Sequence, residues 1–208
     1  MNNLLIVESN NDKYFIEALL KHINISIEID SPVYTIDEYE CLGGISKLEN
    51  KLKSLKSQVL KNGINKIGII FDADSAGIES RTLEIQQKID LVFGEMPELA
   101  FSIHILNVDG TGELETLLKA IKSKASPMAD CLDAWQQCLS LNNKALKAKD
   151  FDKFWINIYH RFDCCSKKEQ KQAGCKCNNE ASLKKSIYDF DKQELNPLKH
   201  FLKKLSTA

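Results

Sequence analysis

The segment Ile69-Ile70-Phe71-Asp72-Ala73-Asp74-Ser75-Ala76-Gly77 decides the expected fold of this chain. Its apolar first part predicts a buried strand that ends in two carboxylates spaced i, i+2, with a glycine three residues later. Burying a carboxylate without a partner costs free energy, so acids at the mouth of a buried strand usually meet a cation, a base or a substrate. Asp72 and Asp74 are therefore the centre of a candidate site.

Two further strand ends carry acids. The apolar run Leu4-Leu5-Ile6-Val7 leads into Glu8, with Asp12 four residues beyond it. A later strand is followed by Gly110-Thr111-Gly112 and then by Glu113 and Glu115. Ligands of open parallel sheets bind beyond the carboxyl ends of the strands. We therefore expect these acids to converge on one crevice.

The remaining pattern predicts an α/β fold: a Rossmann-like central sheet that is mostly parallel and flanked by helices, with a helical C-terminal extension. Residues 1–124 would form the α/β domain and residues 125–208 the extension packed on it. Strands are expected at 3–8, 33–40, 66–71 and 101–108, and helices at 10–23, 45–59, 77–93 and from 110 onward. After residue 124 the strand signal disappears, and helices are expected at 127–142, at 145–162 and after Pro197.

Composition restricts the class of protein. The 208 residues suffice for one α/β domain with an appendage, and no apolar run approaches the roughly 20 residues of a membrane helix. The N-terminus shows no export signal, so a cytoplasmic protein without membrane contact is expected.

The charge is distributed unevenly along the chain. Residues 1–143 carry 13 Lys+Arg against 21 Asp+Glu, whereas residues 144–208 carry 15 against 8. This asymmetry suits a metal site beside a phosphate-holding surface, and equally suits lysine-rich surface helices that keep the C-terminal half soluble.

The acidic cluster indicates a divalent cation. Carboxylates that lie close together cannot all stay ionised without one, and oxygen ligands favour Mg²⁺ or Mn²⁺. Gly77 would allow a tight turn into a helix whose amides favour an anion, and Arg81 would reach a phosphate. Three of the acids also have an ordinary explanation in the first turn of a helix, where negative charge is favoured. These are Asp12, Glu113 and Glu115.

The motifs together resemble the Toprim module of topoisomerases, DnaG-type primases, RecR-type recombination proteins and OLD-family nucleases. The resemblance covers about residues 1–120 and depends on Glu8 after one strand and Asp72-x-Asp74-x-x-Gly77 after another. The wider layout is similar to small stand-alone Toprim-like bacterial proteins, through Gly43-Gly44-Ile45, Gly112-Glu113-Leu114-Glu115 and Pro197-Leu198-x-x-Phe201-Leu202. One departure is Ser9, which replaces the usual glycine after the Toprim glutamate.

The resemblance implies a Mg²⁺-dependent nuclease or related phosphodiester-processing protein that acts on nucleic acid, DNA rather than RNA, in DNA repair or phage defence. Asp72 and Asp74 would hold the metal, Glu8 would be a further ligand or the general acid/base, and Glu113 and Glu115 would complete a second metal position. The alternative is a non-catalytic module of the RecR type that binds nucleic acid or a protein. A homodimer or a protein partner is compatible with both readings.

A third hypothesis is a receiver-like or haloacid-dehalogenase-like phosphotransfer domain, which also places acids at strand ends. It requires a lysine after a later strand, and no such lysine follows Val108. Aromatic residues in the basic half are candidates for stacking on bases or, given their helical spacing, for the core. These are Phe154, Trp155, Tyr159 and Phe162.

Seven cysteines are present, and without an export signal they predict reduced thiols or a metal site rather than a disulfide framework. Thiolates and imidazole are good Zn²⁺ ligands, so the loop 163–180 is a candidate for a structural zinc site. The alternative is a loop of free thiols. The candidate ligands are His160, Cys164, Cys165, Cys175 and Cys177, whereas Cys41, Cys131 and Cys138 are expected to be small buried residues.

Overall fold

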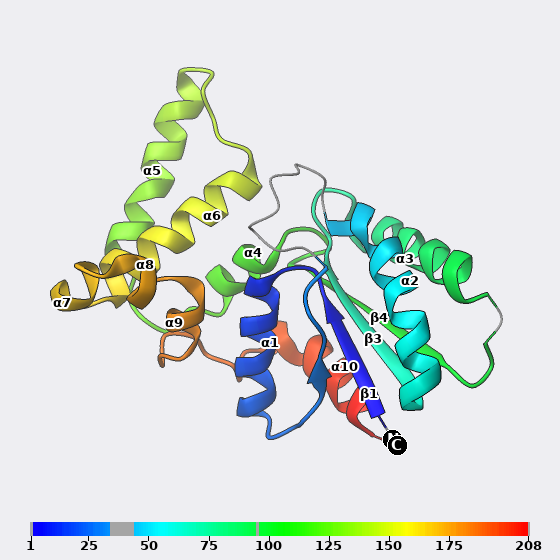
Figure 1. The fold of residues 1–208 in the computed structure, drawn as a ribbon. Helices are drawn as coiled ribbons and strands as arrows, with labels where there is room; N and C mark the ends of the chain where they lie inside the picture. The colour runs from blue at the N-terminus through cyan, green and yellow to red at the C-terminus, as the bar shows by residue number, and fades with distance from the viewer. Residues whose placement is uncertain (1, 34–43, 95, 208) are drawn as a thin grey trace.

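A computed structural model describes residues 2–33, 44–94 and 96–207. Four parallel strands form one sheet in the order β2-β1-β3-β4 (Figure 1). The strands are β1 (Asn2–Val7), β2 (Glu28–Ile29), β3 (Ile64–Asp72) and β4 (Ala100–Leu106). Because all four run in the same direction, their carboxyl ends lie at one edge of the sheet. The fold is therefore a Rossmann-like α/β fold, as the sequence predicts.

Alternate residues along each strand enter two separate cores, as the two-residue period of a strand requires. Leu4 and Ile6 pack with α2 and α3 on one face of the sheet, whereas Leu5 and Val7 face the helices of the other face. Figure 1 shows α2 and α3 on one side, with α1 and α10 on the other. The helices that connect or cover the strands are α1 (Asn10–His22), α2 (Gly44–Asn62), α3 (Gly77–Phe93), α4 (Leu114–Ala120) and α10 (Asn196–Ser206). Both faces of the sheet are therefore covered, which is why its central strands are apolar throughout.

Helices also make up the chain from residue 127 to the start of α10. Helices α5 and α6 form a hairpin that projects from the sheet domain, and α7, α8 and α9 lie near its base (Figure 1). These elements are α5 (Pro127–Leu141), α6 (Ala148–Ile158), the π-helical turn η1 (Tyr159–Cys164), α7 (Lys167–Gln170), α8 (Ala173–Lys176), α9 (Asn179–Leu183) and the 3₁₀ turn η2 (Gln193–Leu195). Trp155 and Tyr159 are fully buried, and they hold α6 and η1 in the same core that Leu5 and Val7 enter from the sheet.

The expected elements agree with the structure except in two places. The strand expected at 33–40 lies almost wholly outside the described residues, and its one described residue, Val33, is not in a strand. The sheet edge beside β1 is instead the two-residue strand β2, which is too short to give a periodic pattern. The loop expected at 163–180 contains three short helices. The helix expected after Pro197 is α10, whose Phe201 and Leu205 pack against the sheet.

Gly68 is the position where α10 comes closest to the sheet. A Cβ atom added at Gly68 would lie 2.4 Å from Cδ2 of Leu205 and 2.9 Å from Cδ1 of Leu5. We expect Gly68→Val to lower the free energy of unfolding by about 2 kcal/mol, because the added carbons must displace buried leucines. Chemical denaturation measures this loss. The control Gly174→Ala places its Cβ in open space and should change stability little; equal effects of the two variants would refute this packing.

Candidate carboxylate site at the edge of the sheet

The first two acids of the site come from neighbouring strands. Because β1 and β3 are paired in parallel with Val7 opposite Ile70, both strands end at the same level of the sheet. Glu8 follows β1 directly, and its Oε2 atom accepts a hydrogen bond of 3.4 Å from the Asp72 amide at the end of β3. The expected convergence of Glu8 and Asp72 is thus present.

Close packing against Glu8 explains why residue 44 is a glycine. Gly44 is the first residue of α2, and a Cβ atom there would come within 2.5 Å of both Cγ and Oε1 of Glu8. No side chain larger than hydrogen fits unless the Glu8 carboxylate moves. The Gly-Gly-Ile segment of the sequence therefore has a physical reason at its second glycine, which allows the N-terminal end of α2 to approach Glu8.

Burial changes the titration of both acids. The pKa of Glu8 is raised from 4.5 to about 7, first by desolvation, then by the negative charges of Asp12 and Asp74, against the hydrogen bond from the Asp72 amide and the charge of Arg81. The pKa of Asp72 is raised well above its usual value by burial, and further by Asp12, Glu8 and the later acids. The Oδ1 atom of Asp72 is buried and has no hydrogen-bond partner. Asp72 is thus a buried carboxyl group for which the described protein supplies no cation.

Asp74 connects the end of β3 to the loop after β4. Its backbone has a positive φ of 50°, its amide donates to the Gly112 carbonyl at 2.9 Å, and the Gly112 amide donates back at 3.0 Å. This two-bond bridge places Glu113, the next residue, beside Asp74. Arg81 on α3 then holds the Asp74 carboxylate, with 2.7 Å between a terminal guanidinium nitrogen and Oδ2.

Two lysines from the C-terminal half reach the same acids. Lys149 on α6 lies 3.2 Å from Oδ1 of Asp74 and 2.7 Å from Oε1 of Glu113. Lys153, one helical turn later, lies 3.0 Å from Oε2 of Glu113. Burial acts to raise the pKa of Asp74, but a hydrogen bond with Glu113 and the charges of Lys149 and Arg81 outweigh it, so the pKa is lowered. The helical extension therefore contributes directly to the site.

The charges of the cluster divide into two groups. Asp74 and Glu113 have ion pairs with Arg81, Lys149 and Lys153. The other four acids have no ion pair with the described part of the chain; these are Glu8, Asp12, Asp72 and Glu115. Uncompensated carboxylates of this kind either take up protons or bind a cation.

Asp12 and Glu115 also stabilise the starts of their helices. Oδ2 of Asp12 accepts hydrogen bonds from the amide and hydroxyl of Ser9, at 2.8 and 2.7 Å, and the Asp12 amide donates to the Ser9 hydroxyl. This capping box gives Ser9 a purpose that the glycine usual in Toprim proteins would not serve. Glu115 lies in the first turn of α4. Burial raises the pKa of both acids, and the nearby negative charge of Glu113 raises both further, so each lies close enough to the cluster to interact with it.

The donor set fits a hard cation in type, since it consists of carboxylate oxygens and includes a buried oxygen without a partner. Among the described residues, however, no three His, Cys, Asp or Glu side chains stand in an arrangement ready to hold a metal ion. Lys149 and Arg81 take part of the space around Asp74. Metal binding would thus require side-chain rearrangement centred on Glu8 and Asp72.

Gly77 and Arg81, expected to hold phosphate, have internal partners. The Gly77 amide donates to the Ala73 carbonyl at 3.1 Å, and the residue has a φ of 82°, which favours glycine. Arg81 is largely buried, donating to the Asp72 carbonyl and contacting Glu84 as well as Asp74. Both residues therefore shape the turn that carries Asp72 and Asp74. The lysines of α6 are the more exposed cations at this edge.

The cysteine loop differs from the zinc expectation. Cys165 and Cys177 form a disulfide, Cys175 is exposed, and His160 is buried against the Tyr188 hydroxyl. The loop folds back through α7 and α8, which brings the two bonded cysteines together, while Cys164 is a free thiol. The described thiols therefore form no four-cysteine zinc site. Cys131 and Cys138, expected to be buried, are exposed on α5, and Cys41 lies outside the described residues.

The aromatic candidates divide between core and surface. Trp155 and Tyr159 are buried, whereas Phe154 and Phe162 are exposed.

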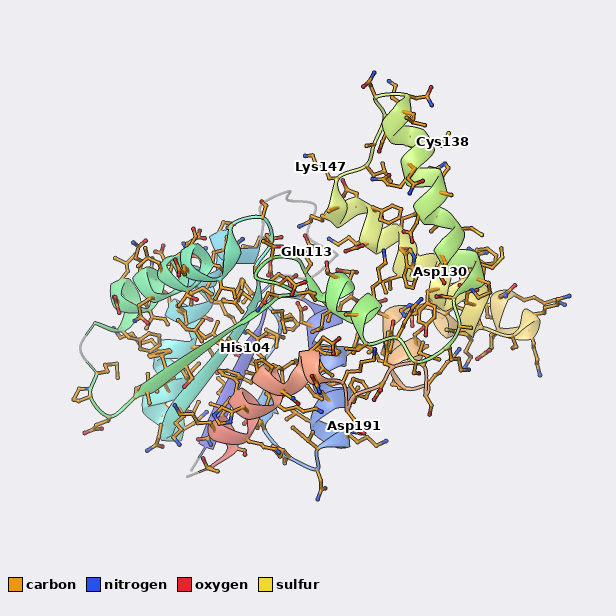
Figure 2. The ribbon with its side chains drawn as sticks, turned by 180° about the vertical axis from the view of Figure 1, so that it is seen from behind. His104, Glu113, Asp130, Cys138, Lys147 and Asp191 are labelled. Carbon is orange, nitrogen blue, oxygen red and sulfur yellow. A yellow bond between two sulfur atoms is a disulfide. The ribbon has the colours of Figure 1, made fainter. Side chains whose placement is uncertain are left out.

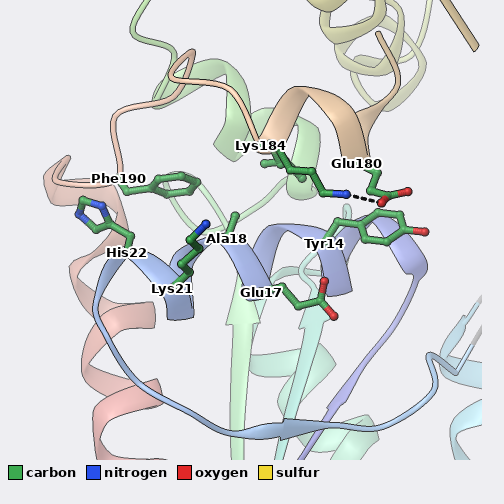
Figure 3. Close-up of a pocket in the computed structure, with 9 residues that line it drawn as sticks. Tyr14, Glu17, Ala18, Lys21, His22, Glu180, Lys184 and Phe190 are labelled. Atoms are coloured by element: carbon green, nitrogen blue, oxygen red, sulfur yellow. Dashed lines mark hydrogen bonds and ion pairs between the residues drawn. The ribbon is translucent and has the colours of Figure 1, made fainter. Parts of the chain in front are cut away.

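A separate pocket of about 510 Å³ lies between α1 and α9 and includes none of the acids discussed above (Figure 3). Its lining combines Tyr14 and Phe190 with charges of both signs, and the Lys184–Glu180 ion pair closes one side.

Lys149 and Lys153 are the site residues that the sequence analysis missed. Their only signals were the i, i+4 spacing of two lysines on one helix face and the opposite charge balance of the two halves. Neither signal indicates which acids the lysines would meet, because the contact spans about 75 residues of chain, as in the pair of Lys149 with Asp74.

Taken together, the fold and the site define a class: a Rossmann-like α/β protein with a buried carboxylate cluster at the carboxyl edge of a parallel sheet. Within that class the chain belongs to the family described as protein of unknown function (DUF3226), whose model matches residues 2–207. Comparisons with curated proteins and with solved structures gave no match. None of the described helices is long and apolar enough to cross a membrane.

The raised pKa of Glu8 predicts how stability depends on pH. Because the folded protein binds this proton more tightly than the unfolded chain, the free energy of unfolding should fall as pH rises from about 4.5 to about 7. In a chelating buffer at pH 8, we expect Glu8→Gln to raise the free energy of unfolding by about 2 kcal/mol and to flatten this dependence. Denaturation across pH measures both effects. Glu98→Gln, on an exposed residue, is the matched control, and a Glu8→Gln variant no more stable than the control would contradict the argument.

A second prediction concerns the contact between the two halves of the chain. Lys149→Ala should lower the free energy of unfolding by about 1 kcal/mol without divalent ions, because Lys149 bridges two carboxylates but is itself half exposed. In a double-mutant cycle with Glu113→Gln the two losses should not add. Lys144→Ala, on an exposed lysine before α6, serves as control. Additive losses would show that the ion pair contributes nothing.

Proposed function

We propose that this protein is a Mg²⁺- or Mn²⁺-dependent nuclease, or a related phosphodiester-processing protein, with a Toprim-like acidic cluster. The observation that carries the proposal is the meeting of Glu8 and Asp72 at the ends of adjacent parallel strands, with one buried Asp72 oxygen that has no hydrogen-bond partner among the described residues. A divalent cation would supply charge stabilisation and water activation for attack on a phosphodiester.

Each residue has a distinct role in this proposal. Asp72 is the principal metal ligand, because its Oδ1 atom is buried without a hydrogen-bond partner and no cation of the described residues pairs with it. Asp74 is the second ligand and is held ready in its ionised form by Arg81 and Lys149. Glu8, with its pKa near 7, can hold or release a proton at neutral pH, which suits a general acid/base as well as a ligand. Glu115 and Glu113 would complete a second metal position.

Nucleic acid, with DNA favoured over RNA, is the proposed substrate. The basic half of the chain supplies Lys149 and Lys153 at the edge of the acidic site, where a phosphate could exchange for a carboxylate as their partner. Exposed Phe154 lies on the same helix and is a candidate for stacking on a base. The polarity of the site thus suits a strand lying along α6 with one phosphate directed at the acids.

A second candidate function is a binding module without turnover, of the RecR type. The observation that favours it is that no three side chains of the described chain are pre-arranged for a metal ion, while two cations already contact Asp74. In that case the lysines would bind phosphates and the acids would tune their position. Binding that tolerates Asp72→Asn, with no cleavage, distinguishes this function from the first.

The test is cleavage of labelled single- and double-stranded DNA and RNA with Mg²⁺, with Mn²⁺ and with a chelator. We expect metal-dependent cleavage that falls about a hundredfold or more in Asp72→Ala and Asp74→Ala, the scale on which one electrostatic group affects a rate. Glu98→Gln should cleave as the parent does, and circular dichroism should show that all variants fold. Cleavage retained in Asp72→Ala and Asp74→Ala would exclude this site, and binding without cleavage would favour the second candidate.

A further inference from the structure

Lys149 is the cation that bridges acids from two different strand ends. Its ammonium nitrogen lies 3.2 Å from Oδ1 of Asp74, after β3, and 2.7 Å from Oε1 of Glu113, which precedes α4. Figure 2 shows Glu113 below the start of α6, with Lys147 labelled above it. A divalent ion that used either carboxylate would have to compete with this ammonium group, because two cations repel each other over so short a distance. Lys149 thus occupies a cation position of the candidate site.

The cations at Asp74 differ in how easily they can leave. Arg81 is 8% exposed and is also bonded to the Asp72 carbonyl and to Glu84, so its guanidinium group is held from several sides. The side chain of Lys149 is 53% exposed, and its ion pairs are with the two site acids. An anion arriving from solvent can therefore reach Lys149 but not Arg81.

The position of Lys149 in α6 favours such an anion. Lys149 is the second residue of the helix, and Lys147, at the N-cap, makes no side-chain capping bond. The N-terminal end of a helix has a partial positive charge, which disfavours a cation there and favours a phosphate. The start of α6 is therefore a poor place for an ammonium group unless an anion accompanies it.

Lys153 faces different acids. It lies 3.0 Å from Oε2 of Glu113, and its positive charge acts to lower the pKa of Asp12 and of Glu115, against the burial of both groups. Lys153 is therefore directed toward acids that have no ion pair within the described ranges, whereas Lys149 bridges the two acids that are already paired. Of the two lysines, Lys149 is the one whose departure would release both paired acids.

We propose that Lys149 is an exchangeable internal cation, which holds Asp74 and Glu113 in the free protein and moves to a backbone phosphate when nucleic acid binds. This exchange rests on the proposed function, since it requires the acids to bind a divalent ion. Once the ammonium group has moved, Asp74 and Glu113 lose a competing partner and can share Mg²⁺ or Mn²⁺ with the buried Asp72 carboxylate. Binding of the metal ion and binding of nucleic acid should therefore strengthen each other.

The first test measures Mn²⁺ binding to the full chain without nucleic acid, from the loss of the free-ion signal in electron paramagnetic resonance. We expect Lys149→Gln to bind Mn²⁺ about tenfold more tightly than the parent, because its amide has no charge to compete with the ion. Lys149→Arg keeps the charge and should bind as the parent does. Circular dichroism should show that the variants fold.

Lys147→Gln is the matched control for charge. It removes one positive charge two residues away, from an exposed lysine that has no ion pair with any described residue. Solvent screens such a charge, so its removal should change the affinity for Mn²⁺ by about twofold at most. Asp72→Asn, added to Lys149→Gln, should abolish the gain and so place the ion at this site.

The second test repeats the titration with saturating single-stranded oligothymidylate, and the oligonucleotide alone serves as the blank for the Mn²⁺ that it binds itself. We expect the DNA to tighten Mn²⁺ binding about tenfold in the parent and in Lys147→Gln. The gain in Lys149→Gln should be about fivefold smaller or less, because the competing ammonium group is already absent.

The outcomes separate this exchange from the proposed function. Equal Mn²⁺ affinity in the parent and Lys149→Gln, or an equal gain in Lys149→Gln and Lys147→Gln, would overturn the exchange and leave the proposed metal site intact. A gain that survives Asp72→Asn, or an equal effect of DNA in the parent and Lys149→Gln, would overturn it as well. If no variant binds Mn²⁺ with or without DNA, the exchange and the metal-dependent function both fall, and the binding module without turnover remains.

Discussion

The structure depends on one constraint: a parallel sheet covered on both faces buries the acids at its carboxyl edge, and burying them costs free energy. Parallel strands buried on both faces must end where side chains converge, and here Glu8 and Asp72 end neighbouring strands in contact. Desolvation and mutual repulsion raise the pKa of both groups, and one oxygen of Asp72 has no partner. Such burial costs several kcal/mol per uncompensated charge, which packing elsewhere must offset. An arrangement that opposes folding and yet recurs at three strand ends is best explained by a functional site.

The helical extension partly offsets this cost. Lys149 and Lys153 approach from α6, and Arg81 approaches from α3, so that the outer acids Asp74 and Glu113 are paired with cations. The inner acids Glu8 and Asp72 have no ion pair with the described part of the chain. The site therefore contains one group of carboxylates already neutralised and another that still requires protons or a metal ion. Because the neutralising lysines belong to the extension, its position and the electrostatics of the site cannot be separated.

Much of the fold was predictable from the residues. The apolar run before Asp72, the alternation of strands and helices up to residue 120, and the glycine at position 77 predicted β3, α3 and the edge where the acids meet. The structure adds that Gly77 has a positive φ. Gly44 proved necessary for a reason invisible in the sequence, since the contact it permits is with Glu8, 36 residues earlier. Strand β2 was not predicted, because two residues are too few to show the alternating pattern of a strand. The buried assignment of Cys131 and Cys138 was wrong, because residue type indicates a preference for burial and cannot show that a helix projects from the molecule.

The sequence by itself determined a parallel α/β fold and the chemical character of its site, because strand period, apolar runs and acids at strand ends are local properties of the chain. Only the tertiary structure decided which charges meet. It placed α10 on the sheet, paired Arg81 with Asp74 instead of leaving it for phosphate, and brought Lys149 to acids far away in the sequence. The physical reason is that ion pairs and disulfides form between groups that folding brings within a few ångströms, and a linear pattern of residues does not contain that distance.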